Sequence, residues 1–223
     1  MVDEALVDLT QDRTVLRTLY APSAGAFAMV DVPGLPFAML DGEGPPSQSA
    51  IGAAVRNLYT AIYVIRRQAR ERMGKSFVEA PVEVLYWAED MRDLAAGNRE
   101  NWHWRVQITL PVWSTAHSLR ESVAEMRGEL GASGAVRWEI SVEGRCVQYL
   151  HIGQTSALPR IIERLYGEHL PKEGLEPDGP YHEIYLDDWN RVSENRRKII
   201  LRQPVRAMKQ AESYSLLQSG GIS

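Results

Sequence analysis

The stretch Glu83-Val-Leu-Tyr-Trp-Ala-Glu89 has a counterpart near the other end of the chain, His182-Glu-Ile-Tyr-Leu-Asp-Asp188. Both runs are rich in aromatic and branched apolar residues, which is typical of a β-strand. Laid over one another, they place Tyr86 on Tyr185. Around both runs, the same landmarks recur in the same order: a strand close to a glycine, a helix with a Leu-Tyr pair, and a last strand that ends in Pro-Val. We therefore expect one β-α-β-β unit to occur twice.

The hydrophobic pattern predicts the elements of both units, since strands alternate with period two and helices bury every third or fourth residue. The expected strands are 35–40, 82–88, 102–110, 136–142, 146–152, 182–187 and 199–205, and the expected helices are 8–20, 47–74, 115–130 and 156–170. Strands 136–142 and 146–152 flank Glu143-Gly144-Arg145 and are predicted to form a hairpin. The expected fold class is α+β, a pseudo-symmetric tandem of two β-α-β-β modules with an antiparallel sheet and a central ligand groove.

The whole chain, 1–223, is expected to form a single domain. Module one spans about 33–112, a connecting helix about 115–131, module two about 136–206, and a C-terminal tail 207–223. A seam between two related modules is concave, and such seams are favoured ligand sites.

Composition excludes several classes of protein. The 223 residues are 44% hydrophobic and carry a net charge of −4, which is ordinary for a globular protein and excludes disorder as the main state. The slightly acidic balance argues against direct nucleic-acid binding. No apolar stretch reaches the roughly 20 residues of a membrane-spanning helix, so no membrane partner is expected. The acidic start of the chain and the single cysteine, Cys146, favour a cytoplasmic protein.

No motif for a bound metal or cofactor is evident. The five histidines lack the spacing of metal ligands, and one cysteine cannot form a thiolate site. A Gly-x-Ser-x-Gly elbow is missing, and Gly42-Glu-Gly-Pro-Pro46 is too short for a nucleotide-binding loop. We therefore expect neither metal nor cofactor.

A series of short blocks resembles the GyrI-like small-molecule-binding family in its stand-alone form. The resemblance covers roughly residues 30–206. The blocks are Ala38-Met-Leu-Asp-Gly-Glu-Gly-Pro-Pro46, Leu58-Tyr-Thr-Ala-Ile-Tyr63, Val84-Leu-Tyr-Trp-Ala-Glu89, Trp102-His-Trp-Arg105, Cys146-Val-Gln-Tyr-Leu-His-Ile-Gly153, and His182-Glu-Ile-Tyr-Leu186 with Leu201-Arg-Gln-Pro-Val205.

The resemblance implies a tandem of β-α-β-β modules around a central groove. Related domains bind bulky, aromatic, often cationic drugs in multidrug-sensing regulators, behind a helix-turn-helix domain. Only about thirty residues precede the first strand here, so a transcription factor is not expected. One stand-alone branch hydrolyses the cyclopropane ring of DNA-alkylating natural products. The implied partner is therefore a small-molecule drug or natural product, and the protein is expected to be a monomer or homodimer.

Glu183 and Tyr185 are the candidate catalytic residues. Residues two apart in a strand share a face, so Glu183 and Tyr185 point away from Ile184 and Leu186. The resemblance places the central acid of the family's pocket at Glu183. A carboxylate among aromatic rings can neutralise a cationic ligand or act as a general acid or base. The alternative is a strand glutamate on a solvated face.

The chain has six Trp and nine Tyr but only three Phe, and Trp and Tyr rings suit ligand pockets as well as cores. We expect a cage to draw on seven of them, and about half of these seven to line the groove: Tyr86, Trp87, Trp104, Trp113, Trp138, Tyr149 and Tyr185. Tyr86 is favoured because the repeat pairs it with Tyr185. His151 shares a face with Tyr149, and it and His182 are weighed as acid–base groups against a purely structural role. The candidate ligand-binding residues are Tyr86, Trp87, Trp104, Trp113, Trp138, Tyr149 and His151.

Two main functions stay open. The first is binding of bulky aromatic or cationic xenobiotics in an acid-bearing aromatic groove, which protects by sequestration. The second is a cofactor-independent hydrolase in which Tyr185 donates a hydrogen bond to a conjugated carbonyl and Glu183 deprotonates the attacking water. A third reading is a regulator that acts by protein contact, as the gyrase-inhibitory namesake of the family suggests.

Overall fold

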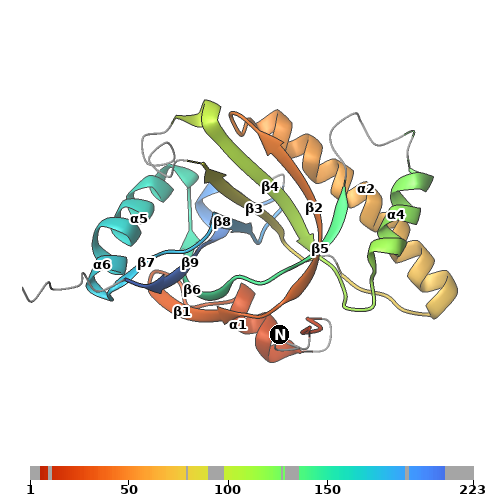
Figure 1. The fold of residues 1–223 in the computed structure, drawn as a ribbon, viewed down its shortest axis with the longest axis horizontal. Coiled ribbons are helices and arrows are strands. Elements are labelled where there is room, and N and C mark those ends of the chain that lie inside the picture. Colours follow the sequence, from red (N-terminus) through yellow and green to blue (C-terminus); the bar gives the residue numbers. More distant parts are fainter. Residues whose placement is uncertain are drawn as a thin grey trace, which may run out of the picture.

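The computed structural model describes residues 6–9, 12–78, 80–89, 98–126, 128, 136–188 and 191–208 (Figure 1). The first half contains α1 (Arg13–Tyr20), β1 (Phe27–Val32), β2 (Leu35–Glu43), α2 (Gln48–Met73), β3 (Val82–Ala88), η1 (Arg99–Asn101), β4 (Trp102–Thr109) and α4 (Ala116–Glu125). The second half contains β5 (Arg137–Ser141), β6 (Gly144–Ile152), η2 (Thr155–Ala157), α5 (Leu158–Arg164), η3 (Leu165–His169), α6 (Leu170–Lys172), β7 (Leu175–Pro177), β8 (Tyr181–Tyr185), η4 (Glu194–Arg196) and β9 (Lys198–Ala207). None of the helices described is both long enough and apolar enough to cross a membrane.

The strands form one antiparallel sheet whose centre is the pair β3 and β8, one from each half of the chain. β4 and then β2 follow on one side, and β9 and then β6 on the other. The predicted α+β fold of two related modules is therefore confirmed. Each module places its middle strand at the centre of the sheet, which brings the two repeated stretches side by side.

Two long, bent strands close the sheet on itself. β1 runs into β2 and β5 runs into β6, each across two residues. These long strands pair in one continuous register, with Val32 opposite Gly144 and Leu35 opposite Ser141. In Figure 1, β1 and β6 cross the lower part of the molecule, and β2 continues from β1 toward the top. Because β2 also pairs with β4, and β6 with β9, the ladders lead round the sheet without a free edge between the two modules.

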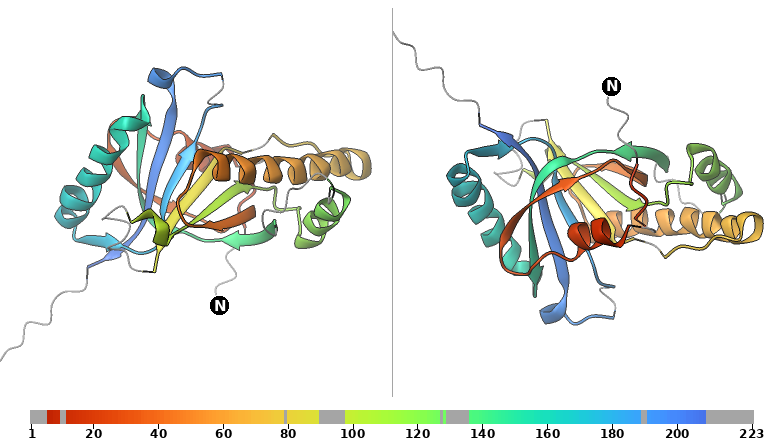
Figure 2. Two further views of the ribbon diagram at one scale, coloured as in Figure 1. Left: turned by 90° about the horizontal axis from the view of Figure 1, so that it is seen from above. Right: turned by 90° about the horizontal axis from the view of Figure 1, so that it is seen from below.

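The two faces of the curved sheet are covered differently (Figure 2). We call one the helix-covered face: α2 packs on β2, β3 and β4, and α5 with α6 packs on the strands of the second module. The opposite, inner face is closed by Leu19 and Tyr20 of α1, which pack against residues such as Phe37 and Ile184. Alternation along β3 and β8 therefore sends Val84 and Glu183 to the helices, and Glu83 and His182 to the interior.

Helix α2 has the boundaries that the sequence indicates. The Ser47 hydroxyl accepts a hydrogen bond from the backbone N–H of Ala50, and Gly74 ends the helix with a φ of 62°. Only glycine adopts such a left-handed conformation without strain. The predicted apolar stripe, including Ala54, Leu58 and Ile62, is buried.

The predicted hairpin between strands 136–142 and 146–152 is wrong. β5 pairs with β2, and β6 pairs with β1 and β9. Gly144 has a φ of 64°, so the link at Val142 and Glu143 bends the strand without reversing it. The alternating pattern that suits a hairpin suits a bent strand equally, because both bury every second residue.

Other differences concern lengths and short elements. β1 and β7 were not expected, the first helix begins at Arg13 rather than at residue 8, and the last strand continues to Ala207. The helix expected at 115–130 ends at Glu125, and residues 127, 129 and 130 of that prediction lie outside the described residues. The helix expected at 156–170 is divided by a π-helical turn at η3. Of the expected C-terminal tail, residues 209–223 also lie outside the described part.

Candidate functional site

Glu183 lies at the centre of the sheet, where the two repeated stretches meet. Val84 of β3 faces Glu183 of β8, and the alignment of the two stretches lays the same two residues on each other. The local symmetry axis of the duplication therefore passes through this pair. Tyr86 and Tyr185 each stand two residues further along, on the same helix-covered face, so the symmetric placement of the two tyrosines is observed.

Three tyrosines surround the Glu183 carboxylate. The Tyr181 hydroxyl donates to Glu183 Oε1 at 3.1 Å, and the Tyr185 hydroxyl donates to Glu183 Oε2. Tyr86 is hydrogen-bonded to Tyr185, which leaves the Tyr86 hydroxyl to donate to the Tyr185 oxygen. We call Tyr86, Tyr181, Glu183 and Tyr185 the Glu183 cluster. Sequence reasoning missed Tyr181, although its position two residues before Glu183 puts it on the same face.

Aromatic rings extend the cluster across β3 and β4. The Tyr86 ring stacks on Tyr181 with 6.2 Å between centroids and 25° between planes. Trp102, the first residue of β4, meets Tyr86 edge-on at 6.0 Å, and the Arg99 guanidinium lies 5.6 Å from the Trp102 ring centroid. Trp102 is partly exposed, so a polarised aromatic surface borders the acid.

The charge states of the cluster follow from burial and hydrogen bonding. Burial raises the pKa of Glu183 above its ordinary 4.5, although the hydroxyls of Tyr185 and Tyr181 and the charge of His182 oppose the rise. Burial, together with the negative charge of Glu183, also raises the pKa of Tyr86, Tyr181 and Tyr185. The three phenols are therefore neutral donors at every pH near neutrality, and Glu183 is the group that titrates.

This arrangement has two chemical uses. The carboxylate of a partly exposed glutamate, flanked by ring faces, attracts an organic cation, because rings and carboxylate both favour positive charge. A carboxylate with a raised pKa can also take a proton from water while a neighbouring phenol donates a hydrogen bond. Among the described residues, no group of three His, Cys, Asp or Glu side chains could hold a metal ion.

Two of the other candidates lie near the cluster. Trp104 faces Tyr86 across β3 and β4 but is 6% exposed and packs under α2. Tyr149 faces Leu201 of β9, which in turn faces Glu183, and it packs with Tyr86 and Tyr185 in one apolar cluster.

The remaining four candidates are not brought to Glu183. Trp113 packs edge-on against Phe77. Trp138 of β5 donates its indole N–H to Ser114 Oγ at 3.3 Å. His151, near the end of β6, makes a 2.9 Å hydrogen bond between Nε2 and the carbonyl oxygen of Gln154.

Trp87 points to the inner face, because it follows Tyr86 in the strand. There it stacks on His103 with 5.8 Å between ring centroids. It lines a hollow of about 500 Å³ that Glu183 does not border. The lining residues are Leu85, Trp87, Arg105, Pro177, Gly179 and Pro180.

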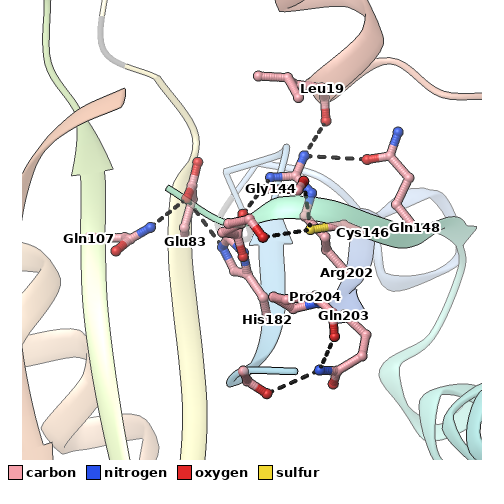
Figure 3. A network of polar contacts seen from close by, with 12 residues as sticks. Leu19, Glu83, Gln107, Gly144, Cys146, Gln148, His182, Arg202, Gln203 and Pro204 are labelled. Carbon is pink, nitrogen blue, oxygen red and sulfur yellow. Dashed lines mark hydrogen bonds and ion pairs between the residues drawn. The ribbon is translucent and has the colours of Figure 1, made fainter. Parts of the chain in front are cut away.

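The His182 side chain lies on the inner face, in a buried network of polar contacts, and its role there is structural (Figure 3). It is fully buried, with Nδ1 2.8 Å from Glu143 Oε1 and Nε2 3.1 Å from Glu83 Oε2. Burial alone would lower the pKa of His182, but Glu143 and Glu83 raise it to about 9. Arg202 binds Glu143 Oε2 at 3.1 Å, so two cations and two carboxylates balance in the interior. Because His182 is buried and each of its ring nitrogens is paired with a carboxylate, it is not available as an acid–base group at an exposed site.

The chain is similar to known proteins over most of its length. A family model described as the GyrI-like small molecule binding domain matches residues 26–204, which confirms the resemblance inferred from the sequence blocks. No curated protein sequence matches the chain.

Three solved structures from Listeria innocua share 27–28% sequence identity with the chain. An uncharacterized conserved protein has a TM-score of 0.76 and 28% identity, over 90% of this chain and 100% of that one. A hydrolase has a TM-score of 0.70 and 27% identity, over 86% and 96%. A further hydrolase has a TM-score of 0.71 and 28% identity, over 90% and 99%.

Proposed function

Because the chain belongs to the GyrI-like small molecule binding domain family, we propose that it binds bulky aromatic cations at the Glu183 cluster and protects by sequestering them. The observation that carries the proposal is the carboxylate of Glu183 held by two phenol hydroxyls and bordered by stacked rings. Flat rings supply contact area for an aromatic ligand, and the carboxylate supplies charge selectivity.

A pair of ions with the same shape and opposite charge tests the proposal. Tetraphenylphosphonium and tetraphenylborate both carry four phenyl groups, so a difference in affinity reports charge preference. We expect tetraphenylphosphonium to bind at least about tenfold more tightly at pH 7.5, measured by calorimetry, a preference of roughly 1.4 kcal/mol. Equal affinities, or tighter binding of the borate, would refute a cation site.

Substitution of Glu183 tests whether this residue causes the preference for tetraphenylphosphonium over tetraphenylborate. Glu183→Gln keeps the shape of the side chain and removes the charge, and we expect it to abolish the preference for the phosphonium ion. Glu71→Gln is the matched control, since it makes the same change of net charge on an exposed part of α2, where the Glu71 side chain is 61% exposed. The control is expected to retain the preference.

A second candidate function is hydrolysis of electrophilic cyclopropanes. It is favoured by the hydrogen bond from Tyr185 to Glu183 and by two hydrolases among the similar structures, at 27% and 28% identity. Water would attack a ring carbon, the carbon–carbon bond to the conjugated ring would break, and its electron pair would pass to the carbonyl oxygen. Glu183 takes the proton from water while the Tyr185 hydroxyl turns from Glu183 to the carbonyl oxygen and stabilises its developing charge. The proton held by Glu183 then passes to that oxygen, so substrate and water give one product.

Mass spectrometry separates the two candidates. The protein is mixed with an excess of a spirocyclopropyl cyclohexadienone, and the product that has gained one water is followed with time. Many turnovers per protein, lost in Glu183→Gln, would establish the hydrolase. Stoichiometric quenching of tryptophan fluorescence without product would leave sequestration as the function.

A further inference from the structure

Tyr181 makes the longer of the two hydrogen bonds to Glu183 and is the more deeply buried tyrosine. It is 6% exposed, whereas Tyr185 and Glu183 are partly exposed. Its hydroxyl donates to Glu183 Oε1 while its ring stacks on Tyr86. Tyr185 therefore borders the exposed side of the cluster, and Tyr181 supports the carboxylate from within.

Hydrogen bonds from β9 and η3 hold the backbone that precedes Tyr181. The Gln203 side chain, which is fully buried, donates from Nε2 to the carbonyl oxygen of Gly179 at 3.0 Å. The same side chain accepts a hydrogen bond from the Tyr166 hydroxyl, which the π-helical turn η3 carries. Tyr181 thus lies on a fixed backbone, and its hydroxyl does not need to reorganise when a ligand arrives.

From this geometry we propose that Tyr181 is a positioning residue: it fixes the Glu183 carboxylate and favours its charged form, so that the cluster selects cations. The selection of cations rests on the proposed function, whereas the effect of Tyr181 on Glu183 does not require Tyr181 to touch the ligand. A phenol hydroxyl donates a stronger hydrogen bond to an ionised carboxylate than to a neutral carboxyl group. Losing one of the two donors therefore disfavours the charged form of Glu183.

Few other ionisable groups act on Glu183. The groups on β8 are Tyr181 and Tyr185, on the same face as Glu183, and His182, on the opposite face. The group on β3 is Tyr86, whose pKa is also influenced by the charge of Arg99 in η1. The residue that faces Glu183 on β9 is the apolar Leu201. The three phenols stay neutral, and His182 stays charged below pH about 9. Within the described residues, a titration between pH 4 and 8 at this site therefore reports Glu183.

The test is the pH dependence of tetraphenylphosphonium affinity in Tyr181→Phe. Phenylalanine keeps the ring that stacks on Tyr86 and removes only the hydroxyl. Because a hydrogen bond to a charged group is lost, we expect the midpoint of the affinity titration to move up by about one pH unit. Well above the midpoint, where Glu183 is charged in both proteins, the affinities are expected to agree within about threefold.

Tyr20→Phe is the matched control on the inner face. Its hydroxyl donates to Glu83 Oε1 at 2.6 Å, so the variant loses the same kind of buried hydrogen bond on the other side of the sheet. We expect a loss of stability in this control and no change of midpoint. An unchanged midpoint in Tyr181→Phe, or an equal shift in Tyr20→Phe, would overturn the inference.

A ligand-free measurement separates this inference from the proposed function. Carbon-detected NMR of the Glu183 carboxyl gives its titration directly, and Tyr181→Phe should raise the midpoint there as well. If the phosphonium ion does not bind but the NMR midpoint moves, the proposed function fails and the positioning role stands. If Tyr181→Phe does not fold, 3-fluorotyrosine at position 181, a more acidic donor, should lower the midpoint; an unchanged or raised value contradicts the role.

Discussion

Neighbouring residues on β8 have opposite environments because successive side chains of a strand point to opposite faces. His182 is enclosed by Glu83 and Glu143 on the inner face, whereas Glu183 meets tyrosine hydroxyls on the helix-covered face. Both environments shift a pKa, yet only Glu183 is partly exposed to solvent. One dipeptide thus carries an interior ion pair and the candidate binding acid.

Gly42 allows Trp104 to pack flat on β2, and this close approach gives a prediction at a single residue. A Cβ at Gly42 would lie 2.0 Å from Trp104, so Gly42→Ala must displace the indole from the core under α2. We expect it to lower the free energy of unfolding by about 2–3 kcal/mol, as overpacking does. Urea unfolding followed by circular dichroism measures the change.

Gly52→Ala is the contrasting substitution for the same experiment. Gly52 lies within α2, and its added Cβ would meet only Arg56 Nη1, at an ordinary 3.5 Å. Alanine in a helix is expected to stabilise by about 0.5–1 kcal/mol relative to glycine. Equal effects of the two substitutions would refute the close contact at Gly42.

Period-two alternation was sufficient to predict that Glu183 and Tyr185 share one face of the strand, and the repeat added Tyr86. It did not predict that this face is the helix-covered one, since Ile184 and Leu186 were the residues expected under the helices. The same rule, applied two residues before Glu183, would have found Tyr181. Applied to β3, it would have excluded Trp87, which follows Tyr86 and lies on the inner face. Trp113 and Trp138 could not be placed in this way, because their environment depends on how α2, α4 and β5 pack against each other. Composition alone does not distinguish a core tryptophan from one in a binding site.

At the scale of elements, periodicity predicted strands well but not their partners. The segments 136–142 and 146–152 do form strands, yet they pair with β2, β1 and β9 instead of with each other. Pairing depends on the direction in which Gly144 bends the chain, and a glycine permits both a turn and a bend. β1 was missed because its sequence does not alternate: the consecutive residues Ala28 and Met29 are both apolar, and both are exposed.

The start of α2 provides a prediction at this scale. Ser47 Oγ accepts from the backbone N–H of Ala50, whereas no hydrogen bond from Ser49 to the helix backbone is observed; the two hydroxyls are 3.0 Å apart. Ser47→Ala is therefore expected to cost about 1 kcal/mol of unfolding free energy, the typical value for a lost N-cap. Ser49→Ala should cost less than about half of that, and chemical denaturation compares the two. A larger loss in Ser49→Ala would contradict the cap.

At the scale of the whole molecule, the closed sheet separates two polar regions. On the helix-covered face Glu183 lies among neutral phenols, and on the inner face Glu83 and Glu143 lie with His182 and Arg202. Arg202 also donates to the carbonyl oxygen of Leu19, and Tyr20 donates to Glu83, so α1 is tied to the interior ion network. Strands from both modules contribute to this network, which therefore couples the two halves and α1.

This interior network makes stability depend on pH. Burial alone would lower the pKa of His182, but Glu143 and Glu83 raise it from 6.5 to about 9. The stabilisation from His182 is therefore fully present below pH 6.5 and is lost as the pH rises through about 9. Burial alone would raise the pKa of Glu143, but His182 and Arg202 lower it from 4.5 to about 2. Its stabilisation is present above pH 4.5 and is lost as the pH falls through about 2.

We therefore expect the free energy of unfolding, measured in urea at intervals between pH 6 and 9.5, to decline steadily from pH 6.5 to about 9. Glu143→Gln removes one carboxylate from His182 and so lowers the folded-state pKa of His182. The decline should therefore end at a lower pH and be smaller, because less charge holds the imidazolium. His117→Gln is the control, since the His117 side chain is 72% exposed and pairs only with Glu121 among the described contacts. It should retain the decline of the unaltered protein. A flat profile in the unaltered protein, or the same shift in both variants, would show that His182 is not held in its charged form by the interior carboxylates.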